Sequence, residues 1–172
     1  MPAQDQKANR ERYVVVPRTL IFLTRGEEVL LIKGAAHKRL WANLYNGVGG
    51  HVERGEDVLS AAHRELQEET GLKAASLWLC GTVTIDASPD VGVLLFVFRG
   101  EPEDPNAQLR PSSEGTLTWV PQHEIASLPL VEDLYILLPK VLSMRPEMPP
   151  FAARYTYQGD RLQVQFAESS ES

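Results

Sequence analysis

The sequence predicts an α+β fold in which helices cover a mixed β-sheet as an α/β/α sandwich, and three observations lead to this prediction. The chain has 172 residues, the size of one domain that can bury a core. Segments rich in β-branched and aromatic residues outnumber helix-like segments. The two kinds of segment do not alternate regularly, which disfavours a doubly wound parallel sheet.

The first elements expected along the chain are a hairpin and a helix. Residues 13–24 and 29–33 are rich in strand-forming side chains, and the turn residues 25–28 between them indicate a hairpin. A glycine-rich turn at residues 46–50 then precedes a helix expected over residues 57–70.

This helix has a predicted buried face and a recognisable end. Leu59, Ala62 and Leu66 recur at helical spacing, so they are expected to face the core. Gly71 stands where a left-handed C-terminal cap would lie.

The second half of the chain is expected to add strands, a second helix and a terminal hairpin. The strands are expected at residues 77–86, 91–99, 117–120, 155–157 and 162–166. Turn residues at 88–90 and 158–160 separate strands that can pair. The second helix is expected over residues 132–144, where Pro139 would cost about 3 kcal/mol unless it marks a kink or a boundary.

One domain is expected over residues 13–166, because no internal repeat or low-complexity linker divides them. The polar ends, residues 1–12 and 167–172, are expected to be disordered tails. The longest apolar run, residues 91–98, is too short to cross a bilayer, and no signal-peptide pattern is visible. Cys80 is the only cysteine and is expected to be a buried thiol. A cytoplasmic protein is expected.

The net charge of −6 argues against a nucleic-acid partner, since no basic stripe interrupts it. It does not exclude an anionic small molecule, because a divalent cation can lie between carboxylates and phosphates. The four histidines show no metal-ligand spacing, so a zinc site is not expected.

Three glutamates crowd one surface of the first expected helix. Glu65, Glu68 and Glu69 stand at i, i+3 and i+4, where like charges destabilise a helix and the helix dipole disfavours anions. Arg64 can pair with Glu68, but such exposed pairs contribute under about 1 kcal/mol. A bound divalent cation would reverse the repulsion. On spacing alone, a solvated acidic face stays open as the alternative.

The glycines before the helix favour a binding site over a plain connector. They let the backbone pass close to another group, and a freed carbonyl is a further oxygen ligand. These glycines are Gly47, Gly49, Gly50 and Gly55.

Residues 50–72 resemble the Nudix box, the signature of the Nudix hydrolase family, with the pattern G-x5-E-x7-R-E-U-x-E-E-x-G-U, where U is aliphatic. Every defined position is filled, by Gly50, Glu56, Arg64, Glu65, Leu66, Glu68, Glu69, Gly71 and Leu72. The resemblance implies the Nudix fold, a mixed sheet with the box as loop–helix–loop and a C-terminal helix plus hairpin. It also implies an enzyme that hydrolyses a diphosphate linkage attached to a nucleoside.

The resemblance implies a role for each residue of the box. Glu65, Glu68 and Glu69 would ligate Mg²⁺ or Mn²⁺ directly or through water, and the Gly49 carbonyl would be another ligand. Arg64 would orient Glu65 by hydrogen bonding. The metal would neutralise phosphate oxygens and activate the water that attacks phosphorus.

Two glutamates outside this set are also assigned by the resemblance. Glu56 would support the loop and leave the metal to other ligands. Glu114 precedes the short strand at residues 117–120, where similar enzymes place a glutamate that acts as ligand or base. A loop acid in solvent is the alternative.

Residues 44–50 resemble the corresponding turn of the Nudix enzymes that hydrolyse oxidised purine nucleoside triphosphates, the MutT-like branch of the family. That resemblance implies that Asn46, Glu132 and Asp133 read the purine edge. An amide donates and accepts, and a carboxyl whose pKa is raised by burial and by its neighbour can do both as well. The alternative is that the two acids simply begin a helix, where the dipole favours them.

Two departures from that branch weaken its stacking contacts with the base. Leu130 and Tyr45 stand where those enzymes have tryptophan, so the preference for oxidised guanine is not carried over. Trp41 is expected in the core, with base stacking as the alternative.

The expected partner is a small nucleotide, with no nucleic acid and no membrane, and with monomer and homodimer both open. The favoured reaction converts an oxidised or unmodified purine nucleoside triphosphate to the monophosphate and pyrophosphate. A Nudix hydrolase of ADP-ribose, a dinucleoside polyphosphate or a pyrimidine triphosphate is the first alternative. A Nudix-fold module that binds nucleotide without catalysis is the second.

Overall fold

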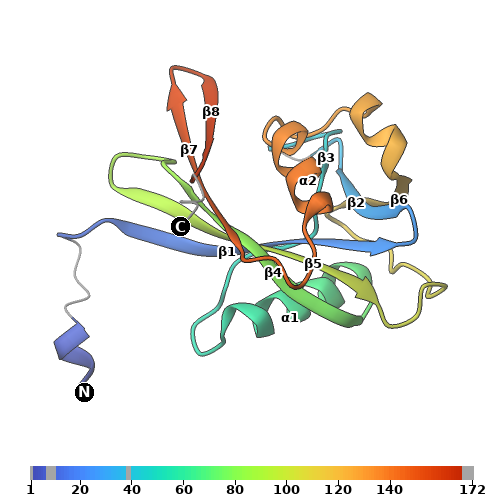
Figure 1. The fold of residues 1–172 in the computed structure, drawn as a ribbon, viewed down its shortest axis with the longest axis horizontal. Helices are drawn as coiled ribbons and strands as arrows, with labels where there is room; N and C mark the ends of the chain where they lie inside the picture. The colour runs from blue at the N-terminus through green and yellow to red at the C-terminus, as the bar shows by residue number, and fades with distance from the viewer. Residues whose placement is uncertain (1, 7–10, 38–39, 168–172) are drawn as a thin grey trace.

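The computed structural model describes residues 2–6, 11–37 and 40–167, which form a curled mixed β-sheet with a helix on either side (Figure 1). The strands are β1 Val14–Arg25, β2 Glu28–Gly34, β3 Tyr45–Asn46, β4 Ala74–Ile85, β5 Val91–Pro102, β6 Gly115–Pro121, β7 Phe151–Gln158 and β8 Arg161–Phe166. The helices are α1 Val58–Thr70 and α2 Leu134–Ser143, with 3-10 helices η1 Ala3–Gln6 and η2 Gln122–Ser127.

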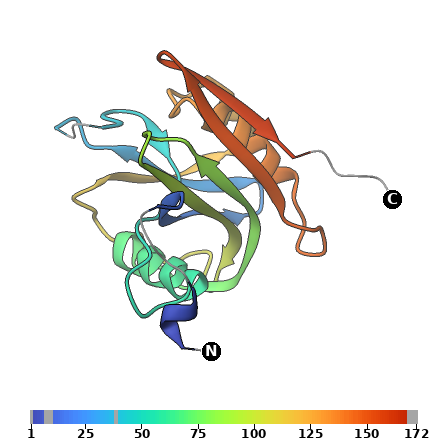
Figure 2. The same cartoon turned by 90° about the vertical axis from the view of Figure 1, so that its left-hand side faces the viewer.

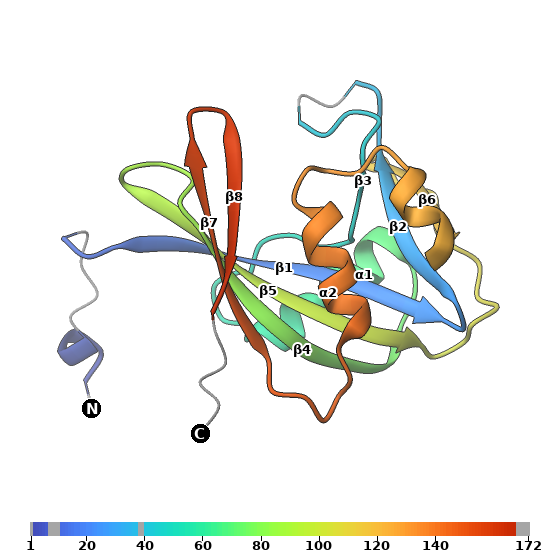
Figure 3. The same cartoon turned by 45° about the horizontal axis from the view of Figure 1, so that its top comes forward.

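The sheet is mixed, as predicted. Its strand order is β3-β2-β1-β5-β4-β7-β8, and β6 pairs with β2 beside this path. β1 runs parallel to β5, and β4 runs parallel to β7, whereas the other pairs are antiparallel. The hairpin of β7 and β8 projects beside the turn that joins β4 and β5, away from the two helices (Figure 3).

β1 lies between two hydrophobic cores, because alternate side chains of a strand point to opposite faces. Leu20 and Phe22 belong to the larger core, which contains the buried face of α2. Ile21 and Leu23 belong to the other core, which contains Leu66 of α1. Figures 1 and 2 show the two helices on opposite sides of the sheet. This is the predicted α/β/α arrangement.

The α1 helix ends at the predicted cap Gly71, and Asp57, predicted as its first residue, is its N-cap. The Asp57 carboxylate accepts hydrogen bonds from the backbone N–H groups of Leu59 and Ser60, both at 2.9 Å. Gly71 adopts φ = 77° and its N–H donates to the Gln67 carbonyl at 2.9 Å. Such caps satisfy the backbone groups that a helix leaves unpaired at its ends.

The prediction that Leu59 faces the core was wrong. Its side chain is 41% exposed, because it lies in the first turn of α1, where Val58 makes the contact with the core instead. The fully buried side chains of α1 are Ala61, Ala62, Leu66 and Thr70.

Four elements differ notably from the prediction in extent or were missed. β7 begins at Phe151, before the predicted start at residue 155, and α2 begins at Leu134. Pro139 lies inside α2 on its exposed side, so it marks no boundary. The short strand β3 and the 3-10 helix η2 were not predicted, because tertiary contacts and not local patterns define them.

Several expectations concern the ends and single side chains. Within the predicted N-terminal tail, residues 3–6 form η1, while residues 1, 7–10 and 168–172 of the predicted tails lie outside the described part of the chain. Cys80 is fully buried as predicted, and burial raises the pKa of its thiol to about 11. Among the described residues, no helix is long and apolar enough to cross a membrane.

We expect Leu66→Ala to lower the free energy of unfolding by about 2 to 5 kcal/mol, because the substitution opens a cavity at a fully buried position. The matched control Leu59→Ala removes a side chain that is 41% exposed, and it should cost less than about 1 kcal/mol. Chemical denaturation of both variants measures the difference. Equal losses would contradict the orientation of α1.

Candidate active site

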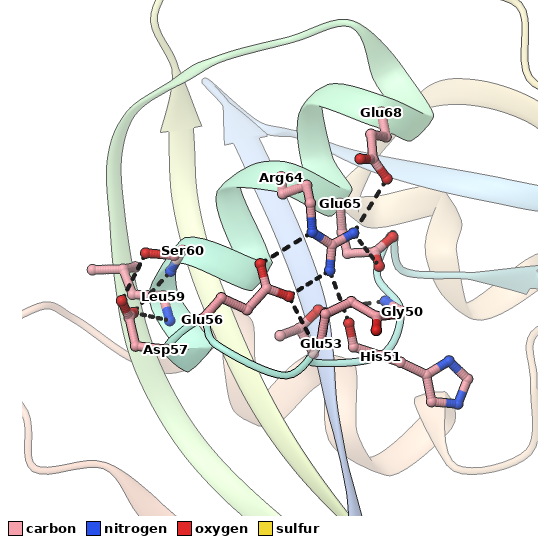
Figure 4. Close-up of polar contacts among 11 residues, drawn as sticks. Gly50, His51, Glu53, Glu56, Asp57, Leu59, Ser60, Arg64, Glu65 and Glu68 are labelled. Atoms are coloured by element: carbon pink, nitrogen blue, oxygen red, sulfur yellow. Dashed lines mark hydrogen bonds and ion pairs between the residues drawn. The ribbon is translucent and has the colours of Figure 1, made fainter.

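The guanidinium of Arg64 lies at the centre of a carboxylate cluster on α1 and the preceding loop (Figure 4). Its Nε and Nη2 donate to the two oxygens of Glu56 at 3.1 and 2.7 Å. Nη1 donates to Glu65 at 2.9 Å and to Glu68 at 3.2 Å, and Nη2 also donates to the His51 carbonyl at 3.0 Å. One cation thereby ties three carboxylates and the loop to the helix.

Electrostatics within this cluster follow from the same contacts. Hydrogen bonds to Glu56 and then Glu65 raise the pKa of Arg64 well above its ordinary value. The hydrogen bonds from Arg64 and from the Glu53 backbone hold the pKa of Glu56 below its ordinary value of 4.5. Glu56 therefore links the loop before α1 to Arg64. Its Oε1 also accepts a hydrogen bond from the Glu53 backbone N–H in that loop at 2.8 Å.

The glycines at residues 49 and 50 are required by close approaches. A Cβ on Gly50 would lie 2.5 Å from the Glu65 carboxylate, so only glycine lets this carboxylate pack against the loop. Gly49 has φ = 153°, and a Cβ there would lie 2.1 Å from the Thr19 carbonyl oxygen. The loop is thus pressed between β1 and α1.

The backbone of Gly49 faces the box helix. The carbonyls of Val48 and Gly50 accept from β1, at Ile21 and Thr19, at 2.7 and 2.8 Å. Because N–H and C=O groups alternate in direction along an extended chain, those of Gly49 point the other way. Its N–H accordingly donates to Glu69 Oε2 at 3.3 Å.

A cavity of about 550 Å³ opens beside this loop and joins the two predicted parts of the site. This volume lies within the range typical of small-ligand sites. Six of the predicted site residues line the cavity: Asn46, Gly49, Glu69, Glu114, Glu132 and Asp133. The other three, Arg64, Glu65 and Glu68, form the cluster described above and do not line it.

β3 connects the glycine loop with the acidic pair. The Tyr45 N–H donates to the Pro129 carbonyl at 2.9 Å, and the Val131 N–H donates to the Tyr45 carbonyl at 3.0 Å. The Tyr135 hydroxyl donates to the Leu128 carbonyl at 2.9 Å and accepts from the Leu130 N–H at 3.1 Å. Asn46 and the acidic pair are therefore held in one hydrogen-bonded unit.

Asp133 lies at the start of α2 and lines the cavity. It occupies the N-cap position of α2, yet its side chain makes no capping hydrogen bond. Burial, and to a lesser degree the charge of Glu132, raise the pKa of Asp133, while the Tyr155 hydroxyl opposes this. Asn46 Oδ1 accepts from the Gly47 N–H at 2.8 Å, which fixes the direction of its amide.

The glutamates of the box do not converge in this structure. Within the described ranges, no group of three His, Cys, Asp or Glu side chains lies close enough together to hold a metal ion. Glu65 and Glu68 point to Arg64, whereas Glu69 points to the Gly49 N–H. The roles assigned to these residues stay predictions.

Sequence reasoning missed two side chains of the cavity and misplaced a third. Arg18 and Tyr155 line it, each with a buried polar atom, Arg18 Nε and the Tyr155 hydroxyl. A charged residue within the strand-like segment 13–24 was the available signal for Arg18. The prediction that Trp41 lies in the core was wrong, because it is 42% exposed and lines the cavity. Its loop is fixed instead by backbone contacts with Gly34.

The two residues that depart from the MutT-like pattern lie outside the cavity lining. Leu130 is 4% exposed and packs in the larger core. Tyr45 lies against Lys33, whose Nζ is 5.7 Å from the ring centroid. The aromatic rings that line the cavity are Trp41, Tyr155 and Tyr157.

A mixed sheet that carries an acidic loop–helix–loop beside a ligand-sized cavity is the arrangement that the resemblance to the Nudix family implies. The family comparison agrees with it. The family model described as the NUDIX domain matches residues 15–141, most of the chain. The chain therefore belongs to the Nudix family.

Individual curated proteins match this chain over about half of its sequence, whereas solved structures match it over most of its length. The chain is 36% identical over 85 residues to an oxidized purine nucleoside triphosphate hydrolase of Danio rerio, covering 49% of this chain and 46% of that protein. It is 35% identical over 80 residues to the NAD-capped RNA hydrolase NudC of Pasteurella multocida, covering 46% and 29%. The chain thus spans less than half the length of these curated relatives.

Solved structures show the same fold. The MutT protein of Bacillus halodurans superposes with a TM-score of 0.73 at 22% identity, over 88% of this chain and 97% of that one. The NUDIX domain of Shewanella oneidensis NrtR, solved in complex with ADP ribose, gives a TM-score of 0.61 at 16% identity, over 83% and 97%. At these identities the likeness concerns the fold alone.

We expect Arg64→Gln to lower the melting temperature at pH 7 and to flatten the acid side of the stability profile. The pKa of Glu56 is lowered in the folded state, so its contribution to stability is present above about pH 4.5 and is lost as the pH falls through the lower folded-state value. Without Arg64 this loss should shrink. Thermal unfolding between pH 6 and pH 3 measures it.

The matched control is Arg161→Gln, which removes one positive charge from the exposed start of β8. Its melting temperature should fall with pH as steeply as that of the unaltered protein. An Arg64→Gln profile parallel to the wild-type profile would contradict the ion-pair assignment.

Proposed function

We propose that the chain is a Nudix hydrolase that converts a purine nucleoside triphosphate, oxidised or unmodified, to the monophosphate and pyrophosphate. The observation that supports this most is that one cavity is lined by residues of both kinds. Gly49, Glu69 and Glu114 line it, and so do the base-recognition candidates Asn46 and Asp133. A nucleotide bridges the same two requirements, since its phosphates need cations and its base needs a polar edge. We place this small-molecule reaction in the cytoplasm.

The proposed metal site uses oxygen donors only. Glu65, Glu68, Glu69 and the Gly49 carbonyl would hold Mg²⁺ or Mn²⁺, with Glu114 as a further ligand or as the base. Hard oxygen donors of this kind are what both ions prefer. When bound, the metal supplies charge neutralisation at the phosphate oxygens and lowers the pKa of the attacking water. The fit is supported by the contact between the Gly49 backbone N–H and the Glu69 carboxylate at 3.3 Å, which brings these two proposed ligand residues together.

Arg64 would determine how far Glu65 and Glu68 must move to bind the metal. It holds Glu65 and Glu68 at 2.9 and 3.2 Å, so these side chains would turn partly from the guanidinium toward the ion. Its bidentate contact with Glu56 keeps it anchored while they turn. Arg64 is in this sense a positioning residue, and it keeps the repulsion among the glutamates low in the absence of metal.

The phosphate and base ends of the cavity differ in chemistry. Arg18 is the only Lys or Arg among the described residues that line the cavity, and its buried Nε suits a phosphate oxygen. At the other end Asn46, Glu132 and Asp133 would read the base. The raised pKa of Asp133 shifts this carboxyl toward its protonated form, which donates as well as accepts.

Other nucleotides are the competing substrates. ADP-ribose, dinucleoside polyphosphates and pyrimidine triphosphates also combine a base with a diphosphate linkage, and the NUDIX domain of NrtR supports ADP-ribose as a comparison compound. A nucleotide-binding module without catalysis is the alternative of a different class. Complete filling of the box positions argues for catalysis.

We expect purine nucleoside triphosphates with Mg²⁺ to release pyrophosphate, and we expect excess EDTA to abolish turnover, because the carboxylates alone repel a polyphosphate. A substrate panel that includes ADP-ribose, dinucleoside polyphosphates and pyrimidine triphosphates measures this by product chromatography. A higher kcat/KM for one of those compounds would transfer the assignment to it. Nucleotide binding without any turnover would identify a binding module.

We expect Glu69→Gln to lower kcat by at least about a hundredfold while the fold persists, since the variant loses one charge that stabilises the transition state. Steady-state kinetics with saturating Mg²⁺ and a thermal melt of the same sample measure both parts. Glu124→Gln, on the exposed surface of η2, is the matched control and should keep wild-type kinetics. Near-wild-type turnover by Glu69→Gln would remove Glu69 from the metal site.

A further inference from the structure

The hydroxyl of Tyr155 is buried in the wall of the cavity, near the Asp133 carboxyl but without a well-formed hydrogen bond to it. Tyr155 is 1% exposed, and its hydroxyl oxygen makes no hydrogen bond of good geometry within the described part of the chain. An unsatisfied buried hydroxyl typically costs about 1 to 3 kcal/mol, and phenylalanine would fill the same space without that cost. Folding alone therefore does not account for the hydroxyl.

Location separates Tyr155 from the other unsatisfied groups. Among the buried polar side-chain atoms without a partner in the described residues, only those of Arg18 and Tyr155 belong to residues that line the cavity. The remaining three, on Trp78, Arg99 and Trp119, lie elsewhere. An orphan group beside a ligand-sized cavity is satisfied when a ligand supplies the partner.

Tyr155 and Asp133 interact across the wall of the cavity, although they come from β7 and from the start of α2. Burial raises the pKa of the Tyr155 phenol, and the nearby Asp133 carboxyl raises it further. Glu132 and Tyr157, which also line the cavity, are the other titratable groups that interact with this pair. Tyr155 thus stays a neutral hydroxyl that can donate and accept.

The surroundings of this pair select for a base and against a phosphate. Glu132 and Asp133 would repel a phosphate, whereas Ile85, Val131 and Leu162 offer apolar surface to the faces of a flat ring. The only Lys or Arg among the described lining residues, Arg18, suits the phosphate end instead. A nucleobase meets both conditions, because its faces are apolar and its edge carries donors and acceptors.

We propose that Tyr155 is a specificity-determining residue whose hydroxyl, acting together with the Asp133 carboxyl, hydrogen-bonds the polar edge of the bound nucleobase. This inference rests on the proposed function, in that the ligand is a nucleotide. It adds a third group to the base-recognition set and makes Tyr155 and Asp133 one unit. A nucleotide whose base edge pairs with this unit should have a higher kcat/KM. A nucleotide whose base leaves the unit unpaired should have a lower kcat/KM.

The test compares kcat/KM for dGTP, dATP, dCTP and dUTP between the wild type and Tyr155→Phe. We expect the preferred nucleotide to lose on the order of tenfold in kcat/KM, the effect of one hydrogen bond, and the poorest to change less than twofold. The loss should lie in KM, because β7 carries none of the residues of the box. The melting temperature should stay equal or rise, because an unsatisfied group is removed.

A matched control and a double-mutant cycle separate recognition from general effects of losing a hydroxyl. Tyr13→Phe removes a hydroxyl that bonds exposed Asp86 at 3.1 Å outside the cavity, and it should leave the preference unchanged. In an Asp133→Asn background, Tyr155→Phe should cost less than twofold, since the unit is already broken. Full additivity of the two substitutions would contradict the shared role.

An unchanged preference in Tyr155→Phe, with the same ratio of kcat/KM values as the wild type, would overturn the inference. Failure of the wild type to hydrolyse any nucleotide would instead contradict the proposed function. In that case, calorimetric titration of the same four nucleotides into both proteins decides the inference. Equal affinities for wild type and Tyr155→Phe overturn it, and a selective loss in the variant supports it.

Discussion

The arrangement of the candidate site depends on how the chain holds several carboxylates together at the end of α1. Arg64 contributes most, because its guanidinium contacts Glu56, Glu65, Glu68 and the His51 carbonyl at once. A lysine has one compact charged group and could not make these contacts in the same geometry. Gly50 complements it, since any Cβ there would displace the Glu65 carboxylate. The loop and the helix are therefore fixed by charge as well as by packing.

A second constraint links the box to the base end of the cavity. β3 pairs with β2 on one side and with the segment at residues 129–131 on the other, so Asn46 and Asp133 keep their relation through backbone hydrogen bonds. Such bonds tolerate side-chain substitution at Leu130 and Tyr45, where this chain departs from the MutT-like pattern. Recognition can then shift to other side chains of the cavity, such as Trp41 and Tyr155, without loss of the framework.

Local sequence signals made the limits of α1 predictable. Contacts between distant segments could not be predicted from such signals. The limits of α1 follow from Asp57 and Gly71, whose capping roles depend on neighbouring residues only. β3 has two residues and exists through bonds to residues 129–131, which no local pattern reveals. The exposure of Leu59 was likewise missed, because periodicity gives the direction of a side chain on a helix but not the extent of the surface that it faces. Trp41 lies in a loop, where no periodicity indicates whether a side chain is buried.

The same reasoning bears on how a chain with a net charge of −6 would bind the polyphosphate of the proposed substrate. Glu69, Glu114, Glu132 and Asp133 line one cavity, and Arg18 is the only Lys or Arg among its described lining residues. An unaccompanied polyphosphate would be repelled at the Glu69 end, so the proposed phosphate binding would depend on a divalent cation there. At the other end, burial raises the pKa of the Asp133 carboxyl, where a neutral base would lie. The acidity of the cavity is thus consistent with an anionic ligand. A divalent cation would offset the carboxylates at the phosphate end, and a neutral base would lie beside the carboxyl groups at the other end.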